Sequence, residues 1–204
     1  MKREAEIRAL FVENAIHLIA KGGFEMATTK ELTHYRGNLP DIKMNEVYIY
    51  RLFGNKESIY VAAFQCLDLE LYEEFKSAIS SVGGFESDTK KRLYEFFILA
   101  WQFLLRNEER CRCYVRYYYS IYFNGASLMS HRRQFMAMVQ EFAPIFKEEA
   151  DVSAILHSVF SALLDFAIRV YNGDIEDNKV NREHIFNVLY CMMMTYFKEP
   201  YGEN

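Results

Sequence analysis

Residues 45–57 hold the side chains best suited to recognition chemistry. Asn45 can cap the start of a helix, and Gly54 can end it in the left-handed conformation that glycine adopts readily. Ile49 and Phe53 are four residues apart and give this short helix one buried edge. Its other edge combines a carboxylate, an aliphatic group, a phenol and a guanidinium, from Glu46, Val47, Tyr48 and Arg51. This pattern is typical of the short helix that helix-turn-helix proteins insert into the major groove of DNA.

A short helix needs packing partners, and the preceding residues predict two more helices. Apolar residues recur at helical spacing across residues 4–21, and two glycines end that pattern. Thr28 begins a Thr-x-x-Glu capping box, which fixes the start of a second helix that ends near residue 36. Because Pro40 disfavours helix, we expect a turn across residues 38–44.

The remaining residues predict a larger helical bundle. Apolar stripes at helical spacing indicate helices near residues 56–81, 87–106, 114–123, 135–146, 152–172 and 182–198. The sequence therefore predicts an all-α fold of about nine helices. We expect a three-helix helix-turn-helix domain at residues 1–65, joined within a helix to a larger helical domain at residues 66–204. Pro144 is expected to kink the helix that contains it.

The composition excludes several classes of protein. Hydrophobic residues make up 51% of the chain, which is enough to build a core. The four cysteines lack the paired spacing of a zinc site and the five histidines are scattered, so we expect no metal and no cofactor. With no nucleophile–base pair and no phosphate-binding loop, we expect no enzymatic activity. The sequence shows no signal-peptide pattern and no run of ~20 apolar residues, which predicts a cytoplasmic protein without a membrane segment.

The net charge of −4 is a poor match for a polyanion. Residues 1–65 hold nine basic and eight acidic residues, whereas the remainder holds 15 and 20. Binding to DNA would therefore depend on a few placed cations and on helix N-termini. A dimer would double that small contribution.

Several short motifs occur in order along the first 65 residues. They mark the end of the first helix, the second helix and the end of the third: Ala15, Leu18, Ile19, Gly23-Phe24, Thr28, Leu32, Gly37, Tyr50-Arg51-Leu52-Phe53 and Lys56-Glu57. Each motif alone is weak. The ordered set resembles the DNA-binding domain of the TetR family of bacterial transcriptional regulators.

The resemblance implies a regulator whose C-terminal domain binds a small-molecule effector and forms a homodimer. In that family the last two long helices usually form a four-helix bundle with their copies in the partner. Here these helices correspond to residues 152–172 and 182–198. A strip of small or short polar residues is suited to such close packing: Ala154, Ser158, Ser161, Ala162 and Asp165.

The resemblance also implies which residues face a double-stranded DNA operator. Thr28, Tyr50 and Lys56 correspond to phosphate contacts, and Val47 and Tyr48 to contacts in the groove. The full set that we expect to face DNA is Thr28, Asn45, Glu46, Val47, Tyr48, Tyr50, Arg51 and Lys56.

Aromatic residues in the middle of the chain are the candidate effector site. Several hydroxyl groups within an apolar bundle indicate a cavity with a few polar anchors, lined by Phe97, Trp101, Tyr114, Tyr118 and Tyr122. Taken singly, each of these side chains is more often a core residue. We expect an apolar or aromatic effector that releases a repressor from DNA. Oxidant sensing by Cys111 and Cys113 is an alternative, although nothing in the sequence marks either thiol as activated.

Two departures from the family pattern favour a second hypothesis. The turn at residues 39–44 is longer than the family's usual turn, and Glu46 stands where the family usually has a cation or a neutral residue. A carboxylate at this position can accept from a cytosine amino group, but it repels phosphate. The alternative is a helical small-molecule-binding or adaptor protein with a degenerate DNA-binding arm.

Overall fold

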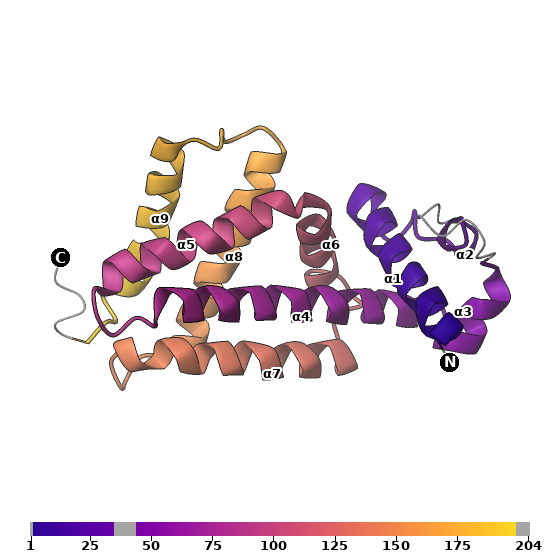
Figure 1. Ribbon diagram of the computed structural model, residues 1–204, viewed down its shortest axis with the longest axis horizontal. Helices are drawn as coiled ribbons and strands as arrows, with labels where there is room; N and C mark the ends of the chain where they lie inside the picture. Colours follow the sequence, from indigo (N-terminus) through magenta and orange to yellow (C-terminus); the bar gives the residue numbers. More distant parts are fainter. Residues whose placement is uncertain (1, 35–43, 199–204) are drawn as a thin grey trace. The chain divides into compact units, whose positions relative to one another are not determined.

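The computed structural model describes residues 2–34 and 44–198 of the chain. Across these two ranges the fold is all-α, with nine α-helices, one 3-10 helix and no β-strand. The helices are α1 (Lys2–Gly22), α2 (Thr29–Leu32), α3 (Glu46–Phe53), α4 (Glu57–Val82), α5 (Thr89–Arg106), α6 (Glu108–Tyr118), α7 (Gly125–Phe142), α8 (Val152–Tyr171) and α9 (Lys179–Met194) (Figure 1). The expected all-α fold of about nine helices is confirmed.

The chain forms two compact units, and each combines segments that are distant in sequence. The first unit consists of Met1–Leu69 and Glu109–His131, and the second of Glu70–Glu108 and Arg132–Asn204. The first unit thus adds most of α6 and the start of α7 to the N-terminal helices. The domain division at residue 65 stays a prediction.

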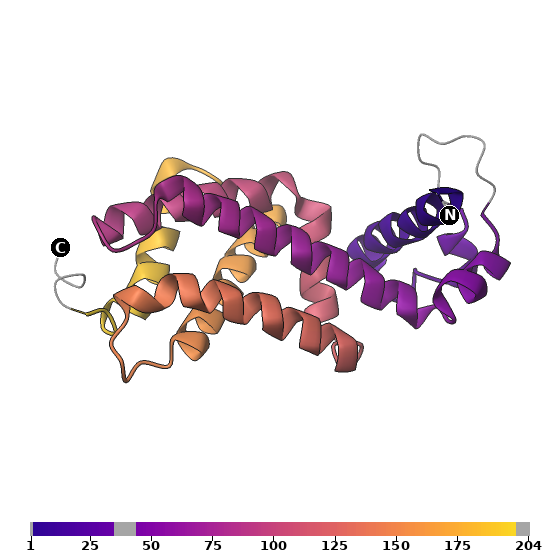
Figure 2. The same ribbon diagram turned by 60° about the horizontal axis from the view of Figure 1, so that its bottom comes forward.

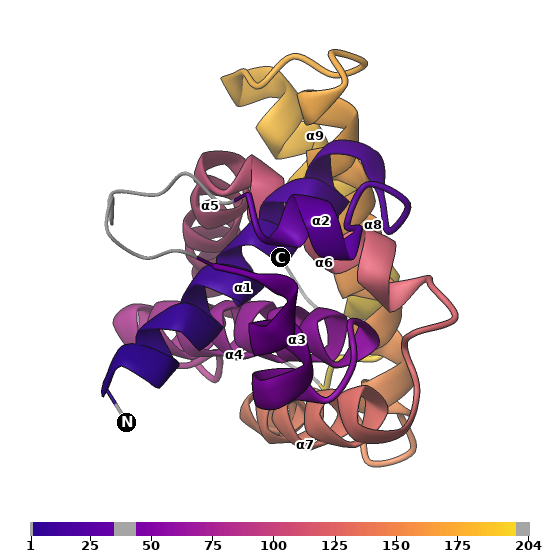
Figure 3. The same cartoon turned by 90° about the vertical axis from the view of Figure 1, so that its right-hand side faces the viewer.

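In the first unit, α1 lies against both α2 and α3 (Figure 3). The buried face of α1 is the apolar stripe that its helical spacing predicts, with Phe11, Ala15, Ile16 and Ile19 at its centre. Leu32 on α2 and Ile49 on α3 are fully buried. These three helices form a small core from which α3 exposes its outer edge.

α3 begins and ends at the residues that the sequence predicts. The Asn45 side chain accepts a hydrogen bond from the backbone N–H of Tyr48 at 3.3 Å. Gly54 has a φ of +82° and donates its backbone N–H to Tyr50 O. Both signals are local, which is why the sequence alone places this helix.

α2 begins as expected but ends earlier. Thr28 Oγ1 accepts a hydrogen bond from the backbone N–H of Glu31 at 3.1 Å, which is one half of a capping box. The backbone N–H of Thr28 donates to Met26 O at 2.9 Å. The helix ends at Leu32 instead of near residue 36. The amide of Asn14 on α1 donates to Glu31 O at 2.9 Å and to Leu32 O at 2.8 Å, so it occupies carbonyls that a longer helix would use. Residues 38–43 of the expected turn lie outside the described residues.

In the second unit, α8 and α9 form an antiparallel pair, and both helices contact α5 (Figures 1 and 2). Their shared core is apolar and includes Leu93, Phe97, Trp101, Leu156, Leu163, Ile185 and Leu189. The expected kink at Pro144 is not found, because α7 already ends at Phe142 and Pro144 lies in the 3-10 helix Ala143–Ile145. A proline ring does not fit inside a continuing helix.

An isolated antiparallel bridge joins Phe146 to Phe197 in the same unit. The backbone N–H groups of Lys147 and Lys198 each donate across it at 2.9 Å, and the two phenylalanine rings pack edge to face. The segment after α9 is therefore attached to the turn that follows α7.

α8 has an apolar surface that the second unit leaves partly uncovered. By length and composition it could cross a membrane, with a mean hydropathy of 1.5 over an 18-residue window, of which only 22% is buried. Serine, histidine, aspartate and arginine residues interrupt its apolar pattern, so α8 holds no run of ~20 apolar residues, and the expectation of no membrane segment stays a prediction. A partly uncovered apolar helix is also suited to packing against a second protein surface.

Candidate functional site

The C-terminal turn of α3 is attached to α1 by Arg8. Its Nη1 donates to Leu52 O at 2.6 Å, and its guanidinium carbon lies 4.3 Å from the centroid of the Phe53 ring. Phe53 also packs edge to face against Phe11. A cation at this end of the helix satisfies a terminal carbonyl and interacts favourably with the helix dipole. Together with the buried Ile49, these contacts hold the buried edge that the sequence predicts.

Arg51 links α3 to the beginning of α1. Its guanidinium carbon lies 4.8 Å from the centroid of the Tyr48 ring, a cation–π contact within the helix. Its Nη2 lies 3.1 Å from Oε1 of Glu4, and both side chains are about half exposed. One cation on the candidate DNA-facing edge is therefore already paired with a carboxylate.

The outer face of α3 exposes two large side chains. Val47 is 71% exposed and Tyr50 is 60% exposed. Glu46 is also exposed, whereas Tyr48 is half-buried. The edge of α3 that faces away from α1 therefore exposes an aliphatic group, a phenol and a carboxylate.

The polar residues around α3 are engaged as helix caps. Asn45 caps α3 and Thr28 caps α2 with their side-chain oxygens. Because the Thr28 hydroxyl accepts through its oxygen, its hydrogen is available to a phosphate. Asn55 caps α4 by accepting from the backbone N–H of Ser58 at 2.8 Å. Lys56 precedes α4, and its Nζ lies 5.7 Å from the Tyr60 ring centroid.

The structure therefore brings the expected DNA-facing residues into the first unit. Most lie on α3, and Thr28 and Lys56 lie at the starts of α2 and α4. Contact between these residues and DNA stays a prediction.

The expected effector residues are divided between the two units. Phe97 and Trp101 belong to the second unit, whereas Tyr114, Tyr118 and Tyr122 belong to the first. Their role in binding an effector also stays a prediction.

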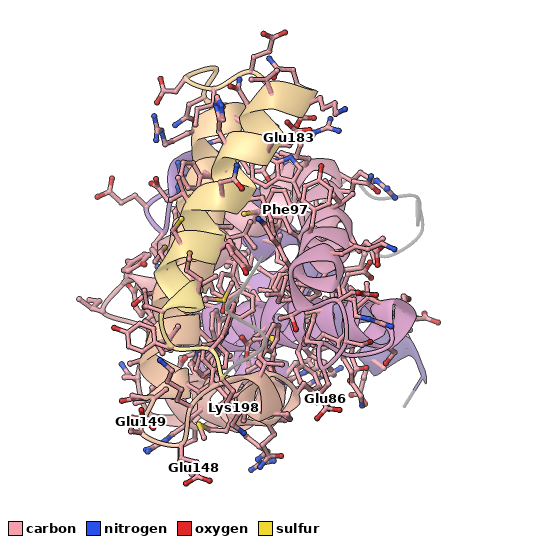
Figure 4. The ribbon with its side chains drawn as sticks, turned by 90° about the vertical axis from the view of Figure 1, so that its left-hand side faces the viewer. Glu86, Phe97, Glu148, Glu149, Glu183 and Lys198 are labelled. Atoms are coloured by element: carbon pink, nitrogen blue, oxygen red, sulfur yellow. The ribbon has the colours of Figure 1, made fainter. Side chains whose placement is uncertain are left out.

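In the second unit, Phe97 lines an apolar cavity of about 40 Å³. Figure 4 shows Phe97 among the side chains between α5 and α9, whereas Glu148, Glu149 and Glu183 lie at the periphery. The other residues lining the cavity are Leu93, Phe96, Phe142, Leu156, Val159, Phe160, Leu163, Phe186, Leu189 and Met193. A cavity that holds benzene measures about 150 Å³, so an effector of that size would have to displace side chains here.

Trp101 is buried behind Phe97, and the two rings stack with their centroids 5.8 Å apart. Its indole N–H donates to Oδ1 of Asp177 at 3.0 Å. The hydrogen bonds of Arg182 to the same carboxyl keep the pKa of Asp177 below its ordinary value. This arrangement anchors the loop between α8 and α9.

In the first unit, the three tyrosines lie in a cluster of aromatic rings. The Tyr114 hydroxyl donates to Oδ1 of Asp68 at 3.3 Å. Burial and the nearby Asp68 raise the pKa of Tyr114 well above its ordinary value, so it remains a donor. Tyr122 packs against Phe24 and Tyr60, with centroids 4.6 and 5.4 Å apart.

The sequence alone did not identify Asp68 or His131 as site residues. Asp68 is 4% exposed, and its Oδ1 lies 2.8 Å from His131 Nδ1. It stands four residues after Phe64, on the stripe that helical spacing assigns to the core. The sequence does carry one signal for Asp68, namely an acidic residue at a position where the helical spacing predicts an apolar one. Glu4, Arg8 and Asn14 were missed because each acts through a helix that is distant in sequence.

The structure also bears on metal binding and on the cysteines. No group of three His, Cys, Asp or Glu residues is placed to hold a metal ion within residues 2–34 and 44–198. Cys111 and Cys113 are buried, and neither is in a disulfide. Burial raises the pKa of Cys113 to about 12, which is the opposite of the shift that activates a thiol toward oxidants.

No family model matches the chain, and no curated protein matches it. Solved structures do match the fold. A TetR-family transcription regulator from Marinobacter aquaeolei VT8 has a TM-score of 0.71 at 15% identity, covering 94% of this chain and 97% of that protein. A putative TetR-family regulator from Shewanella sp. PV-4 has a TM-score of 0.70 at 12% identity, covering 95% and 99%.

A third similar structure contains a small molecule. It is a putative transcriptional regulator from Saccharomonospora viridis in complex with choline, with a TM-score of 0.62 at 12% identity, covering 96% of this chain and 100% of that protein. At these identities the likeness establishes the fold and not the function. The chain has the fold of the TetR family of transcription regulators.

Proposed function

We propose that this protein is a DNA-binding transcriptional regulator, and specifically a repressor that acts as a homodimer in the cytoplasm. The observation that carries the proposal is the exposed edge of α3, which Arg8 and Ile49 hold against α1, within the fold of TetR-family regulators. This is the arrangement that a reading helix needs, namely one packed edge and one free edge.

Val47 and Tyr48 contact base edges in the major groove, and Thr28, Tyr50 and Lys56 contact phosphates. Asn45 and Glu46 stand at the N-terminal end of the same helix, where the first residues of a recognition helix approach the bases. Arg51 contributes a cation once its pairing with Glu4 is exchanged for a phosphate. These contacts supply both positioning and base recognition.

The homodimer forms through α8 and α9. Only 22% of the apolar window of α8 is buried within one chain, and Val188 on α9 is 48% exposed. Ala154 and Ser158 on the exposed face of α8 allow a partner helix to approach closely. Two copies of α3 then contact successive major grooves, about 34 Å apart.

A small apolar or aromatic effector controls this dimer by a population shift. It favours a conformation in which the two copies of α3 no longer match the groove spacing. Two regions support an effector site, the apolar cavity beside Phe97 and the tyrosine cluster of the first unit. The choline complex of the Saccharomonospora viridis protein is a precedent for a small-molecule ligand in this fold.

The test is a mobility-shift titration of the full-length protein on the DNA upstream of its own gene, at several salt concentrations. We expect a sequence-specific complex that the double variant Tyr48→Ala/Lys56→Ala loses. The matched control is Tyr119→Ala/Lys21→Ala, which removes an exposed tyrosine and an exposed lysine elsewhere in the same unit. A complex that withstands the Tyr48/Lys56 double variant, or no specific complex with wild type, contradicts the proposal.

A second candidate function is a helical small-molecule-binding or adaptor protein with a degenerate DNA-binding arm. The specific observation in its favour is the pairing of Arg51 with Glu4 beside the exposed Glu46, which weakens the positive field that DNA binding needs. A folded, dimeric wild-type protein without affinity for any DNA fragment at low salt would favour this function.

A further inference from the structure

A carboxylate lies within the aromatic cluster of the first unit. Asp68 is 4% exposed, and its Oδ1 receives hydrogen bonds from His131 Nδ1 at 2.8 Å and from the Tyr114 hydroxyl at 3.3 Å. A carboxylate removed from water is costly unless hydrogen-bond donors or a cation compensate it. Here the imidazole and the phenol supply such donors, and a cation in the place of the imidazole would compensate the same charge.

Three aromatic rings surround the imidazole that faces this carboxylate. The ring centroids of Tyr118, Phe123 and Phe64 lie 5.3, 5.7 and 6.3 Å from that of His131. Tyr114 extends the set by stacking against Phe64 at 5.2 Å. A ring face attracts a cation within about 6 Å of its centroid, and several rings around one position form the kind of cage that binds quaternary ammonium groups. The centroids of Tyr118 and Phe123 lie within this distance of the imidazole, and that of Phe64 lies just beyond it.

The exposed fractions of these side chains show which side of the cage a ligand would enter from solvent. Phe64 is fully buried and Tyr114 is 7% exposed, so they form the deep wall with Asp68. The His131 side chain is 14% exposed, and Tyr118 and Phe123 are half-buried. The imidazole thus closes the side of the cage that reaches the surface, and it lies on the first two turns of α7.

We propose that Asp68 and the rings of Phe64, Tyr114, Tyr118 and Phe123 form a binding site for a small organic cation, a quaternary or protonated amine, which takes the place of the His131 imidazole. Stability gives little reason to keep a carboxylate here, because well-packed apolar side chains are often at least as stabilising as a buried charged group with its partners. A cation in the cage gains the charge of Asp68 and the ring faces together, whereas a neutral ligand gains only apolar contact.

The site is independent of DNA binding, but its regulatory meaning rests on the proposed function. Replacing His131 would release the start of α7 from α4, since the His131–Asp68 hydrogen bond joins these two helices. The cation would thereby act as a second effector of the proposed regulator, besides the apolar or aromatic one. Asp68 indicates that this effector is positively charged, which the aromatic residues alone do not indicate.

The experiment titrates the full-length protein with tetramethylammonium chloride and, separately, with tert-butanol, a neutral molecule of similar shape, and follows both by NMR and calorimetry. We expect tetramethylammonium to bind at least about tenfold more tightly than tert-butanol, because only the cation interacts with the carboxylate and the ring quadrupoles. His131→Ala should bind tetramethylammonium more tightly than wild type, since no side chain has to be displaced.

Two further variants and one control separate binding at the site from a general effect on folding. Asp68→Asn should weaken tetramethylammonium binding at least about tenfold and leave tert-butanol binding unchanged. Tyr118→Leu removes a ring face, whereas its control Tyr118→Phe keeps one, so only the first should weaken cation binding. If Asp68→Asn does not fold by circular dichroism, the Tyr118 pair alone decides the question.

Equal affinities for tetramethylammonium and tert-butanol overturn the proposal. Binding of tetramethylammonium by His131→Ala but not by wild type also overturns it, because the Asp68–His131 contact is then a structural contact that no ligand displaces. Cation binding that leaves the DNA complex unchanged supports the site and removes its regulatory meaning. Absence of any DNA complex alongside cation binding contradicts the proposed function and leaves the cation site supported.

Discussion

Glu4 on α1 pairs with Arg51 on α3 at 3.1 Å, and the same guanidinium covers the ring of Tyr48. An exposed ion pair contributes little to stability, about 0–1 kcal/mol. Its significance lies in its position, because it neutralises a cation on the edge of α3 proposed to face DNA. Glu4 therefore competes with phosphate for Arg51.

Removing this competitor should strengthen DNA binding. In Glu4→Gln, Arg51 gains a phosphate contact, so we expect tighter DNA binding. The slope of the logarithm of the binding constant against the logarithm of the salt concentration should become steeper by about one. Fluorescence anisotropy across a range of salt concentrations measures both. Glu6→Gln is the control, since it removes the same charge from α1 without a contact to Arg51. Equal effects of the two substitutions would show that net charge matters and the pairing does not.

Asn14→Ala should destabilise the first unit. The substitution removes two hydrogen bonds and takes the amide donor away from Leu32 O, whereas Glu31 O still accepts from the backbone N–H of His34. We expect a loss of about 1–3 kcal/mol in unfolding free energy. Chemical denaturation measures the loss, and Lys21→Ala, an exposed change on the same helix, is the control. Wild-type stability in Asn14→Ala would mean that Leu32 O finds another donor.

The stability of the protein should fall in alkaline solution. Burial raises the pKa of Cys113 from 9.0 to about 12 and that of Tyr114 well above 10.0. The folded state then holds these protons more tightly than the unfolded chain does. The contribution of these two groups to the unfolding free energy is complete below about pH 9, and it is lost as the pH rises toward their pKa values in the folded state.

Urea denaturation at steps between pH 8 and pH 11 tests this behaviour. Cys113→Ala should flatten the decline in unfolding free energy that begins near the ordinary thiol pKa of 9.0. Cys191→Ala removes an exposed thiol and should leave that decline unchanged. A stability that stays constant across this range would contradict the burial of both groups.

Val188→Asp should weaken the homodimer, because it places a charge on the exposed face of α9 proposed to pack against a partner. Light scattering after size-exclusion chromatography at several concentrations measures the dissociation. The matched control is Val47→Asp, another exposed valine, which should abolish DNA binding and leave the dimer intact. A dimer that withstands Val188→Asp would place the interface elsewhere.

The sequence predicts the parts of this fold that depend on local signals. Asn45, Gly54 and Thr28 specify helix ends through their own neighbours, and the structure has them as predicted. Asn14 illustrates the opposite case, since helical spacing places it on the polar face of α1 but its amide is buried against the end of α2. Its role depends on how two helices meet, which residue spacing does not encode.

The candidate effector residues show the same limit at a larger scale. Periodicity identifies Phe97 and Tyr114 as inward-facing, but it does not say toward which partners. The structure places Phe97 at an apolar cavity and Tyr114 on Asp68 in a different unit. Only the fold brings Asp68 and His131, 63 positions apart, within hydrogen-bond distance.

Each compact unit consists of two segments that are distant in the sequence, so it can fold only after its second segment has been synthesised. The first unit needs the chain as far as His131, so the helices that precede residue 70 leave the ribosome well before α6 is available to cover them. The second unit is complete only after the Phe146–Phe197 bridge forms. A nascent chain stalled before α9 therefore exposes the face of α8 that α9 covers in the folded unit, and transiently exposed apolar surface of this kind favours aggregation.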